Sequence, residues 1–179
     1  KKAESDTEKA PVSAPENDFQ GAEVVFDNVD LTYKGAGDKS LSNISFTAPA
    51  GATIGIIGGT GSGKSSLVNL IPRFYDATSG SVNIDGKNVK DYKVREVRNL
   101  VGIVMQKAVL FKGSIRDNMK WGNDQASDEE INFALENAQA AEVVAGKEGG
   151  LDYMLEQNGR NLSGGQKQRL SIARAIARN

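Results

Sequence analysis

The 179-residue chain contains neither cysteine nor histidine. The absence of cysteine excludes disulfides, a thiol nucleophile and cysteine-ligated metal sites, and the absence of histidine excludes histidine–metal clusters and a Ser-His-Asp triad within this chain. No apolar run approaches the roughly 20 residues of a membrane-spanning helix. Neither sign of charge dominates, because 22 basic and 23 acidic residues leave a formal net charge of -1. Bulk charge therefore predicts no binding to nucleic acid or to an anionic membrane.

Both ends of the chain suggest a piece of a longer protein. The first residue is Lys1, no charged segment followed by an apolar one marks a signal peptide, and Asn179 comes just after a strongly helical stretch. Residues 1–20 are rich in charged residues, Ser, Ala and Pro, and their only large apolar side chains are Val12 and Phe19. Such a segment buries too little apolar surface to offset its ordering entropy, so we expect a flexible tail or a linker from a preceding domain.

The pattern changes at residue 21, where a strand-rich region begins. Strands are expected at residues 24–33 with a slip near Asn28, and at 44–47, 53–57, 81–84 and 101–105. The segments 53–57 and 101–105 are short, almost continuous apolar runs, which is typical of strands buried on both faces of a sheet. A helix is expected over residues 66–71.

The second half of the chain is predicted to be mainly helical. A short helix starts near Ser114, and the capping box Ser127–Glu130 opens a helix that runs to about Ala141. A last helix follows Ser163, with apolar residues along one side. The sequence thus predicts an α/β chain with a strand-rich start and a helical second half.

The strongest local motif lies between the predicted strand at 53–57 and the predicted helix at 66–71. It fits the P-loop pattern G-x-x-x-x-G-K-[ST], whose glycines let backbone N–H groups curl around phosphate oxygens. Lys64 is predicted to reach the β- and γ-phosphates, Ser65 to bind Mg²⁺, and Ser66 to lie near the α-phosphate. The alternative is a glycine-rich surface turn beside a solvated lysine. The candidate residues are Gly58, Gly59, Thr60, Gly61, Ser62, Gly63, Lys64, Ser65 and Ser66.

A second glycine-rich motif, Leu-Ser-Gly-Gly-Gln, occupies residues 162–166. Ser163 is a good N-cap, and the pair Gly164-Gly165 would let another molecule approach the first N–H groups of the following helix. Taken alone, the motif is either a second anion-binding site or an ordinary helix start.

Together the two motifs resemble the nucleotide-binding domain of ABC transporters, whose signature sequence is LSGGQ. The resemblance covers residues 21–179. Tyr33 resembles the aromatic residue that stacks on adenine, and Gln106 resembles the Q-loop glutamine that contacts Mg²⁺ and the attacking water. The alternative for Tyr33 is a core or surface side chain of a strand, and the alternative for Gln106 is a polar residue that ends a strand.

Two further stretches point to exporters within that family. Residues 110–118, Leu-Phe-Lys-Gly-Ser-Ile-Arg-Asp-Asn, resemble a stretch of exporter-type members. Residues 156–159, Glu-Gln-Asn-Gly, lie where exporters contact the partner's coupling helices. The resemblance is therefore to multidrug or lipid exporters, in which the ATPase follows the membrane domain in one polypeptide.

The resemblance implies a P-loop NTPase (ABC ATPase) core with an N-terminal antiparallel β region and a helical subdomain. The implied organisation is a linker at 1–20, the core and β region at 21–106, a helical subdomain at 107–162 and the signature helix at 163–179. The implied cofactors are ATP and Mg²⁺, with Lys64 and Gln106 in catalytic roles and Ser65 and Gln106 at the metal. The implied ATP contacts are Tyr33 and Gly58–Ser66 of one copy and Ser163, Gly164, Gly165 and Gln166 of another.

The implied partners are a second nucleotide-binding domain, in a head-to-tail homodimer or heterodimer, and the transmembrane domain of the same polypeptide. No nucleic-acid partner is implied. The implied location is the cytoplasmic face of the cell membrane, where ATP binding and hydrolysis drive transport.

The sequence departs from the family after the signature helix. The family continues with an apolar strand that ends in Asp-Glu (Walker B), a D-loop and a switch histidine, whereas this chain ends 13 residues after Gln166. We therefore expect the fragment to bind ATP weakly and not to hydrolyse it, because the metal-binding acid, the catalytic Glu and the His are missing. Two alternatives stay open: a soluble ABC-type ATPase acting on DNA or ribosomes, and a nucleotide-binding partner subunit that does not hydrolyse ATP.

Overall fold

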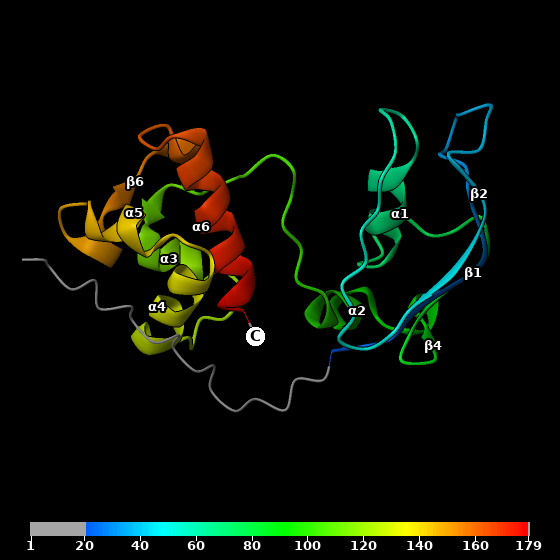
Figure 1. Ribbon diagram of the computed structural model, residues 1–179, viewed down its shortest axis with the longest axis horizontal. Coiled ribbons are helices and arrows are strands. Elements are labelled where there is room, and N and C mark those ends of the chain that lie inside the picture. The colour runs from blue at the N-terminus through cyan, green and yellow to red at the C-terminus, as the bar shows by residue number, and fades with distance from the viewer. Residues whose placement is uncertain (1–20, 179) are drawn as a thin grey trace, which may run out of the picture. The chain divides into compact units, whose positions relative to one another are not determined.

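The structure, a computed structural model, describes residues 21–178 of the chain. The predicted linker at 1–20 lies outside the described residues. The chain forms two compact units that divide between Val94 and Arg95, and Figure 1 shows the elements of each. None of the helices in residues 21–178 combines the length and the hydropathy that crossing a bilayer requires.

The first unit is mainly a sheet and the second is mainly helical. The first contains β1 (Val24–Leu31), β2 (Leu41–Ala48), α1 (Lys64–Leu70), β3 (Ser79–Ile84), β4 (Lys87–Asn88) and the short 3-10 helix η1 (Val89–Asp91). The helix α2 (Val94–Leu100) begins at the division between the units. The second contains β5 (Gly113–Ser114), α3 (Ile115–Lys120), α4 (Asp128–Asn137), α5 (Ala141–Ala145), η2 (Gly150–Asp152), β6 (Met154–Leu155), η3 (Gln157–Gly159) and α6 (Gly164–Ile176).

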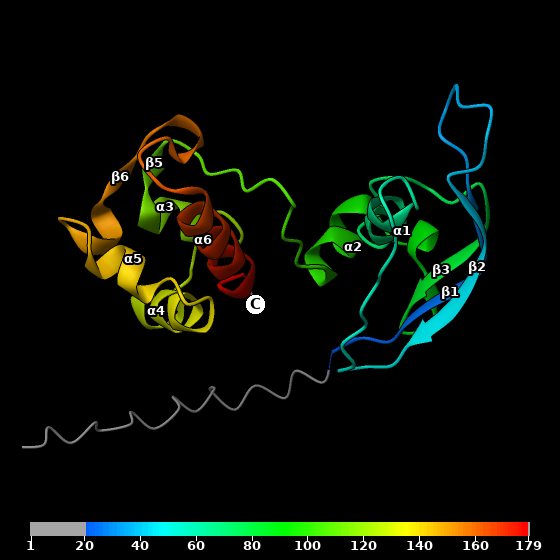
Figure 2. The same cartoon turned by 45° about the horizontal axis from the view of Figure 1, so that its top comes forward.

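An antiparallel sheet in the order β2-β1-β3-β4 forms the frame of the first unit (Figure 2). Phe26, Val29 and Leu31 of β1 are buried. The ring of Phe26 stacks on that of Phe46 across the β1–β2 pair, with centroids 4.7 Å apart. The pairing register shifts between Phe26 and Val29, around Asn28 at φ 48°. The slip that the sequence predicts near Asn28 is thus confirmed, as are the strands that cover 44–47 and 81–84.

Two of the predicted strands are wrong. Residues 53–57 and 101–105 form no strand, and Ile54, Ile56, Ile57, Val104 and Met105 are exposed by 38% or more. A strand that is buried on both faces needs hydrogen-bonded neighbours and covering layers. Within residues 21–178, the sheets contain neither segment. The apolar pattern is present, but the backbone partner that would turn it into a strand is not.

Serine caps define the helices of the second unit. Ser114, Ser127 and Ser163 each accept a hydrogen bond from the backbone N–H three residues on, and each forms a capping box. The predicted helix starts are therefore confirmed. The helix α4 ends at Asn137 rather than near Ala141, because Gln139 lies at φ 54°, outside the helical region.

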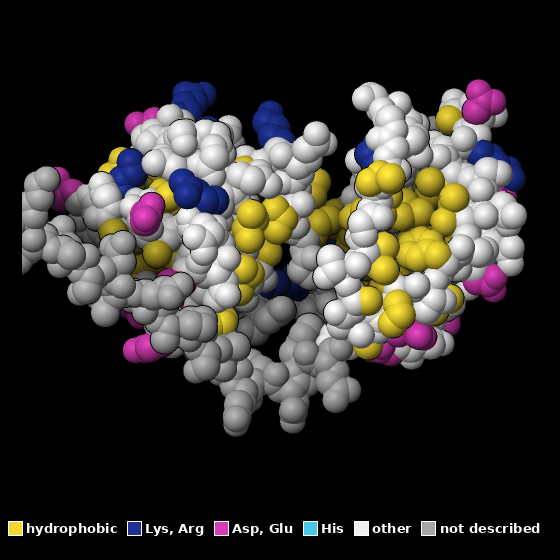
Figure 3. Space-filling view, in the orientation of Figure 1, with side chains coloured by type: hydrophobic (Ala, Val, Ile, Leu, Met, Phe, Trp, Pro, Cys, Tyr) yellow, Lys and Arg dark blue, Asp and Glu magenta, His cyan; other side chains and the backbone are white. Residues whose placement is uncertain are grey.

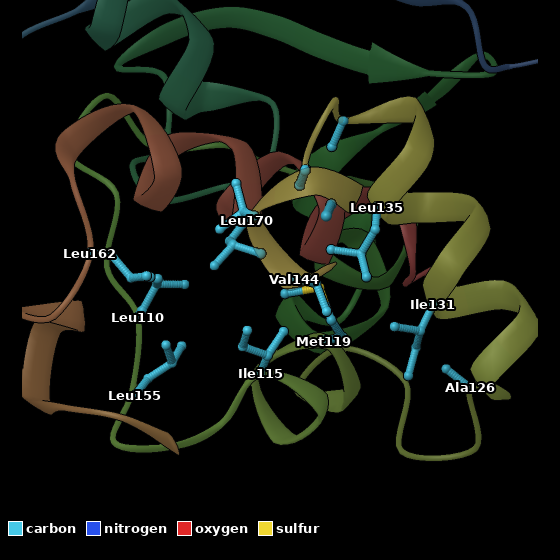
Figure 4. Close-up of a cluster of buried hydrophobic side chains, with 14 residues drawn as sticks. Leu110, Ile115, Met119, Ala126, Ile131, Leu135, Val144, Leu155, Leu162 and Leu170 are labelled. Carbon is cyan, nitrogen blue, oxygen red and sulfur yellow. The ribbon is translucent and has the colours of Figure 1, made fainter. Parts of the chain in front are cut away.

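The second unit has one hydrophobic core, drawn in Figure 4. Ile115 and Met119 of α3, Ile131 and Leu135 of α4, and Leu170 of α6 are all at most 1% exposed. They come from three helices and meet in one cluster because each helix presents apolar residues at a spacing of three or four. This core fixes the start of α6, where the second candidate motif lies.

Candidate nucleotide-binding site

The predicted phosphate-binding loop turns back over its own lysine. The ammonium of Lys64 donates hydrogen bonds to the carbonyls of Gly58, at 2.8 Å, and Gly59, at 2.6 Å. It also donates to the hydroxyl of Ser62 at 3.3 Å. One positive charge therefore organises the loop from inside, while the backbone N–H groups at the start of α1 stay available for an anion.

A close approach to the neighbouring strand requires glycine at the start of α1. Gly63 lies at φ 85°, and a Cβ built on it would come within 2.8 Å of both the Ser40 carbonyl and the Leu41 side chain. The N–H of Leu67 bonds to the carbonyl of Gly63 at 2.9 Å and closes the first turn of α1. The loop is thus anchored to β2, and a side chain at position 63 would disrupt the anchor.

A polar cavity of about 380 Å³ opens beside the loop. It is lined by Asp38, Lys39, Ser40 and residues 61–66. A Cβ at Gly59 or Gly61 would meet nothing within 4 Å, so the space in front of these backbone groups is open. The backbone donors, two lysines and several hydroxyls suit a polyphosphate, so these residues fit the phosphates of ATP.

The predicted base-stacking residue lies at the same site. The hydroxyl of Tyr33 donates a hydrogen bond to the Ser66 hydroxyl at 2.8 Å, which joins the end of β1 to the first turn of α1. The ring of Tyr33 also makes a T-shaped contact with that of Tyr75, with centroids 4.8 Å apart. The structure therefore brings Tyr33 together with the loop, and its stacking on adenine stays a prediction.

The predicted magnesium ligands do not all belong to one unit. Ser65 is exposed at the cavity and can give one oxygen, as Mg²⁺ needs when phosphates and waters supply the others. Among residues 21–178, no group of three or more acidic residues could hold a metal ion. Gln106 lies in the exposed segment at 101–109 of the second unit. Ser65 thus fits the metal, and the role of Gln106 stays a prediction.

The signature motif opens α6 in the second unit. The side chain of Ser163 accepts from the N–H of Gln166, and the Gln166 side chain accepts from the N–H of Ser163 at 3.0 Å. A Cβ at Gly164 or Gly165 would meet nothing within 4 Å. The chain's own packing therefore does not require these glycines, which suits a helix start that another molecule approaches. Their contact with a nucleotide stays a prediction.

The sequence did not indicate all of the residues around the loop. Lys39 and Ser40 line the cavity, and Tyr75 touches Tyr33, although none of them belongs to a motif. The pairing of β1 with β2 brings residue 40 to the loop. A contact of this kind joins distant parts of the chain, so no local sequence pattern indicates it. For Tyr75, the sequence offers only the fact that it is an aromatic residue five positions after the end of α1.

The sequence matches the family described as "ABC transporter" over residues 41–179. It is 42% identical over 178 residues to an "ATP-dependent lipid A-core flippase" of Photobacterium profundum, covering 99% of this chain and 30% of that protein. A flippase of the same description from Vibrio vulnificus is 42% identical, covering 88% of this chain and 27% of its own length. The chain thus spans less than a third of these curated relatives.

A solved structure is similar in fold as well as in sequence. It is titled "Structure of a bacterial Atm1-family ABC exporter with ATP bound", with a TM-score of 0.84 and 37% identity. The match covers 88% of this chain and 28% of that one. The P-loop geometry, the family match and this likeness agree, and the chain belongs to the ABC transporter family.

Proposed function

We propose that this chain is the ATP-binding part of an ABC exporter, which couples ATP binding and hydrolysis to transport across a membrane. The observation that carries the proposal is the loop Gly58–Ser65, curled around Lys64 beside an open polar cavity. The solved exporter with ATP bound and the two flippases support it.

In this proposal, residues of the first unit hold the nucleotide. Lys64 exchanges its carbonyl partners for β- and γ-phosphate oxygens, and the first N–H groups of α1 bind phosphate oxygens. The ring of Tyr33 carries the base, and Ser65 gives one ligand to Mg²⁺, which neutralises phosphate charge when bound. These groups are hydrogen-bond donors, one metal ligand and an aromatic surface, all held in place by the first unit. The first unit therefore binds and orients ATP.

A second copy completes the site. Ser163, Gly164 and Gly165 of the partner would face the γ-phosphate, with the open N-terminus of α6 as the anion-binding element. ATP would thus hold two domains head to tail, and Gln106 would report nucleotide state to the membrane domain of the same polypeptide. The domains would lie at the cytoplasmic face of the cell membrane, and no nucleic acid takes part.

Hydrolysis belongs to the longer protein in this proposal. A water attack on the γ-phosphate needs a residue that positions the water and an acid that holds the metal shell. In the described part of the chain, residues 21–178, no group of three or more acidic residues could hold a metal ion. We propose that the 179-residue chain binds ATP without turning it over.

The test is isothermal titration of the purified chain with Mg-ATP, together with a phosphate-release assay. We expect measurable binding, loss of at least about tenfold in affinity for Lys64→Ala, and no steady phosphate release. The matched control is Lys112→Ala, which removes an exposed lysine of the second unit. If the Lys64→Ala and Lys112→Ala variants bind Mg-ATP equally well, the loop is not the nucleotide site. Steady phosphate release that Lys64→Ala abolishes would show that the 179-residue chain hydrolyses ATP.

A further inference from the structure

Two tyrosines from distant parts of the first unit meet at the loop. The rings of Tyr33 and Tyr75 lie at 83° to each other, with centroids 4.8 Å apart. Tyr33 is half-buried and Tyr75 is 45% exposed. A single T-shaped neighbour covers at most one face of a ring, so Tyr33 keeps a face on which a flat base could stack.

The backbone that carries Tyr75 is held firmly on both sides. Two residues before it, Arg73 pairs with Asp76 at 2.7 Å and donates to the carbonyls of Lys90, at 3.2 Å, and Tyr92, at 3.0 Å. Three residues after it, Thr78 donates to the carbonyl of Asp30 from its N–H and its hydroxyl, at 2.9 and 3.0 Å. Tyr75 is therefore a fixed support.

Tyr33, in contrast, stands at the beginning of a loop. It follows β1, and its carbonyl accepts from the N–H of Ala36 in the turn that leads to residue 40. Its side chain has two contacts that set the ring, the hydrogen bond to Ser66 and the ring of Tyr75. The first ties the ring to the phosphate loop, and the second fixes its tilt.

We propose that Tyr75 is a positioning residue for the nucleotide base, which holds the Tyr33 ring in the orientation that stacks on a purine. This inference rests on the proposed function, because it concerns the same nucleotide site. Tyr75 acts through Tyr33 and not on the phosphates. Preset orientation of an aromatic surface raises affinity because the ring need not be ordered when the ligand arrives.

The experiment compares two ligands that share phosphates but not a base, Mg-ATP and magnesium tripolyphosphate, by titration of the full 179-residue chain. For Tyr75→Ala we expect a three- to tenfold loss in ATP affinity, on the order of one aromatic contact, and unchanged affinity for tripolyphosphate. Tyr75→Phe keeps the ring and should retain the ATP affinity. Tyr75→Leu, which keeps apolar bulk, should lose as much as Tyr75→Ala and serves if the alanine variant folds poorly.

A double-mutant cycle with Tyr33→Ala separates positioning from a general structural role. If Tyr75 acts through Tyr33, Tyr75→Ala costs little further affinity once Tyr33 is alanine. Equal losses for ATP and tripolyphosphate, additive losses in the cycle, or a loss in Tyr75→Phe would each overturn the inference. An unmodified chain that binds both ligands equally tightly contradicts the inference and the base contact of Tyr33 but leaves the phosphate site in place. A chain that binds neither ligand contradicts the proposed function and the inference with it.

Discussion

Asp30, near the end of β1, joins three parts of the first unit. Its carboxylate accepts hydrogen bonds from Lys39 at 2.6 Å, from the N–H of Asn43 at 2.8 Å and from Ser79 at 2.9 Å. The bond from Lys39, followed by those from Asn43 and Ser79, lowers the pKa of Asp30 from 3.8 to about 2. Because Lys39 also lines the cavity, this contact links the stability of the sheet to the nucleotide site.

The depressed pKa predicts how Asp30→Asn changes with pH. A carboxyl whose pKa is lower in the folded chain stabilises the fold above its unfolded pKa, and this stabilisation disappears as pH falls from about 4 to about 2. The unmodified chain should thus have a higher urea midpoint than Asp30→Asn at pH 6, with a difference that shrinks below pH 4. Circular dichroism over this range measures it, with the exposed Asp38→Asn as the control. A difference that is constant with pH would contradict the assigned cause.

Among single residues, the sequence predicts those whose role depends on neighbours close by in the chain. The loop Gly58–Ser65 can be recognised because its glycines, lysine and serine are adjacent in the chain, and the backbone performs much of the binding. The contacts of Asp30 and Tyr75 could not be predicted, because each joins segments that only the β1–β2 and β1–β3 pairings bring together. Their importance comes from the fold and not from a motif.

Among the helices and strands, α3 is held to the segment before it by the buried side-chain amide of Asn118. Asn118 is 1% exposed, and its side chain accepts from the N–H of Phe111 at 2.9 Å and donates to the carbonyls of Phe111 and Ser114, both at 3.0 Å. These bonds join the helix to the segment before it, which has few backbone partners of its own. A buried polar group with all its partners satisfied helps to specify one packing.

Replacing Asn118 should therefore destabilise the second unit strongly. Asn118→Ala removes the side-chain partner of one donor and two acceptors of the backbone, all buried or part-buried, at a cost of about 3 kcal/mol. Trp121 is the only tryptophan and follows α3 directly, so its fluorescence reports on this unit during urea unfolding. Asn132→Ala, on the exposed side of α4, should change the midpoint little. If both variants unfold at the same urea concentration, the buried bonds of Asn118 do not stabilise the helix.

The sequence predicts helices better than strands in this chain. The serine caps at positions 114, 127 and 163 are local signals, since the cap and its partner lie three residues apart. A buried strand depends on partners elsewhere, so the runs at 53–57 and 101–105 have the predicted composition without the predicted ladder. The apolar composition of these segments predicts where a strand could form. Whether it does form depends on a neighbouring strand to which the segment can hydrogen-bond.

For the molecule as a whole, the apolar side chains that lie on the surface, outside the two cores, are the feature with the largest consequence for behaviour in solution. Figure 3 shows hydrophobic side chains gathered on the surface of the first unit. Its exposed large apolar residues include Ile54, Ile56, Ile57, Val68 and Phe74. Contiguous apolar surface of this kind marks an interaction site or a tendency to associate. The chain spans 27–30% of the two flippases, so the proposed longer protein has ample sequence to cover this surface.

This exposure predicts opposite outcomes for two isoleucines of the same unit. Ile57 is 96% exposed, so Ile57→Ser should leave the thermal midpoint nearly unchanged while lowering the binding of a hydrophobic dye and the association at high concentration. Ile84 is 2% exposed, and Ile84→Ser should lower the stability by about 3 kcal/mol, since it removes a buried side chain and adds a polar group to the core. Differential scanning calorimetry and light scattering measure both. If Ile57→Ser melts several degrees lower, as Ile84→Ser is expected to, the side chain of Ile57 is buried in solution and the exposure of the segment at 53–57 is contradicted.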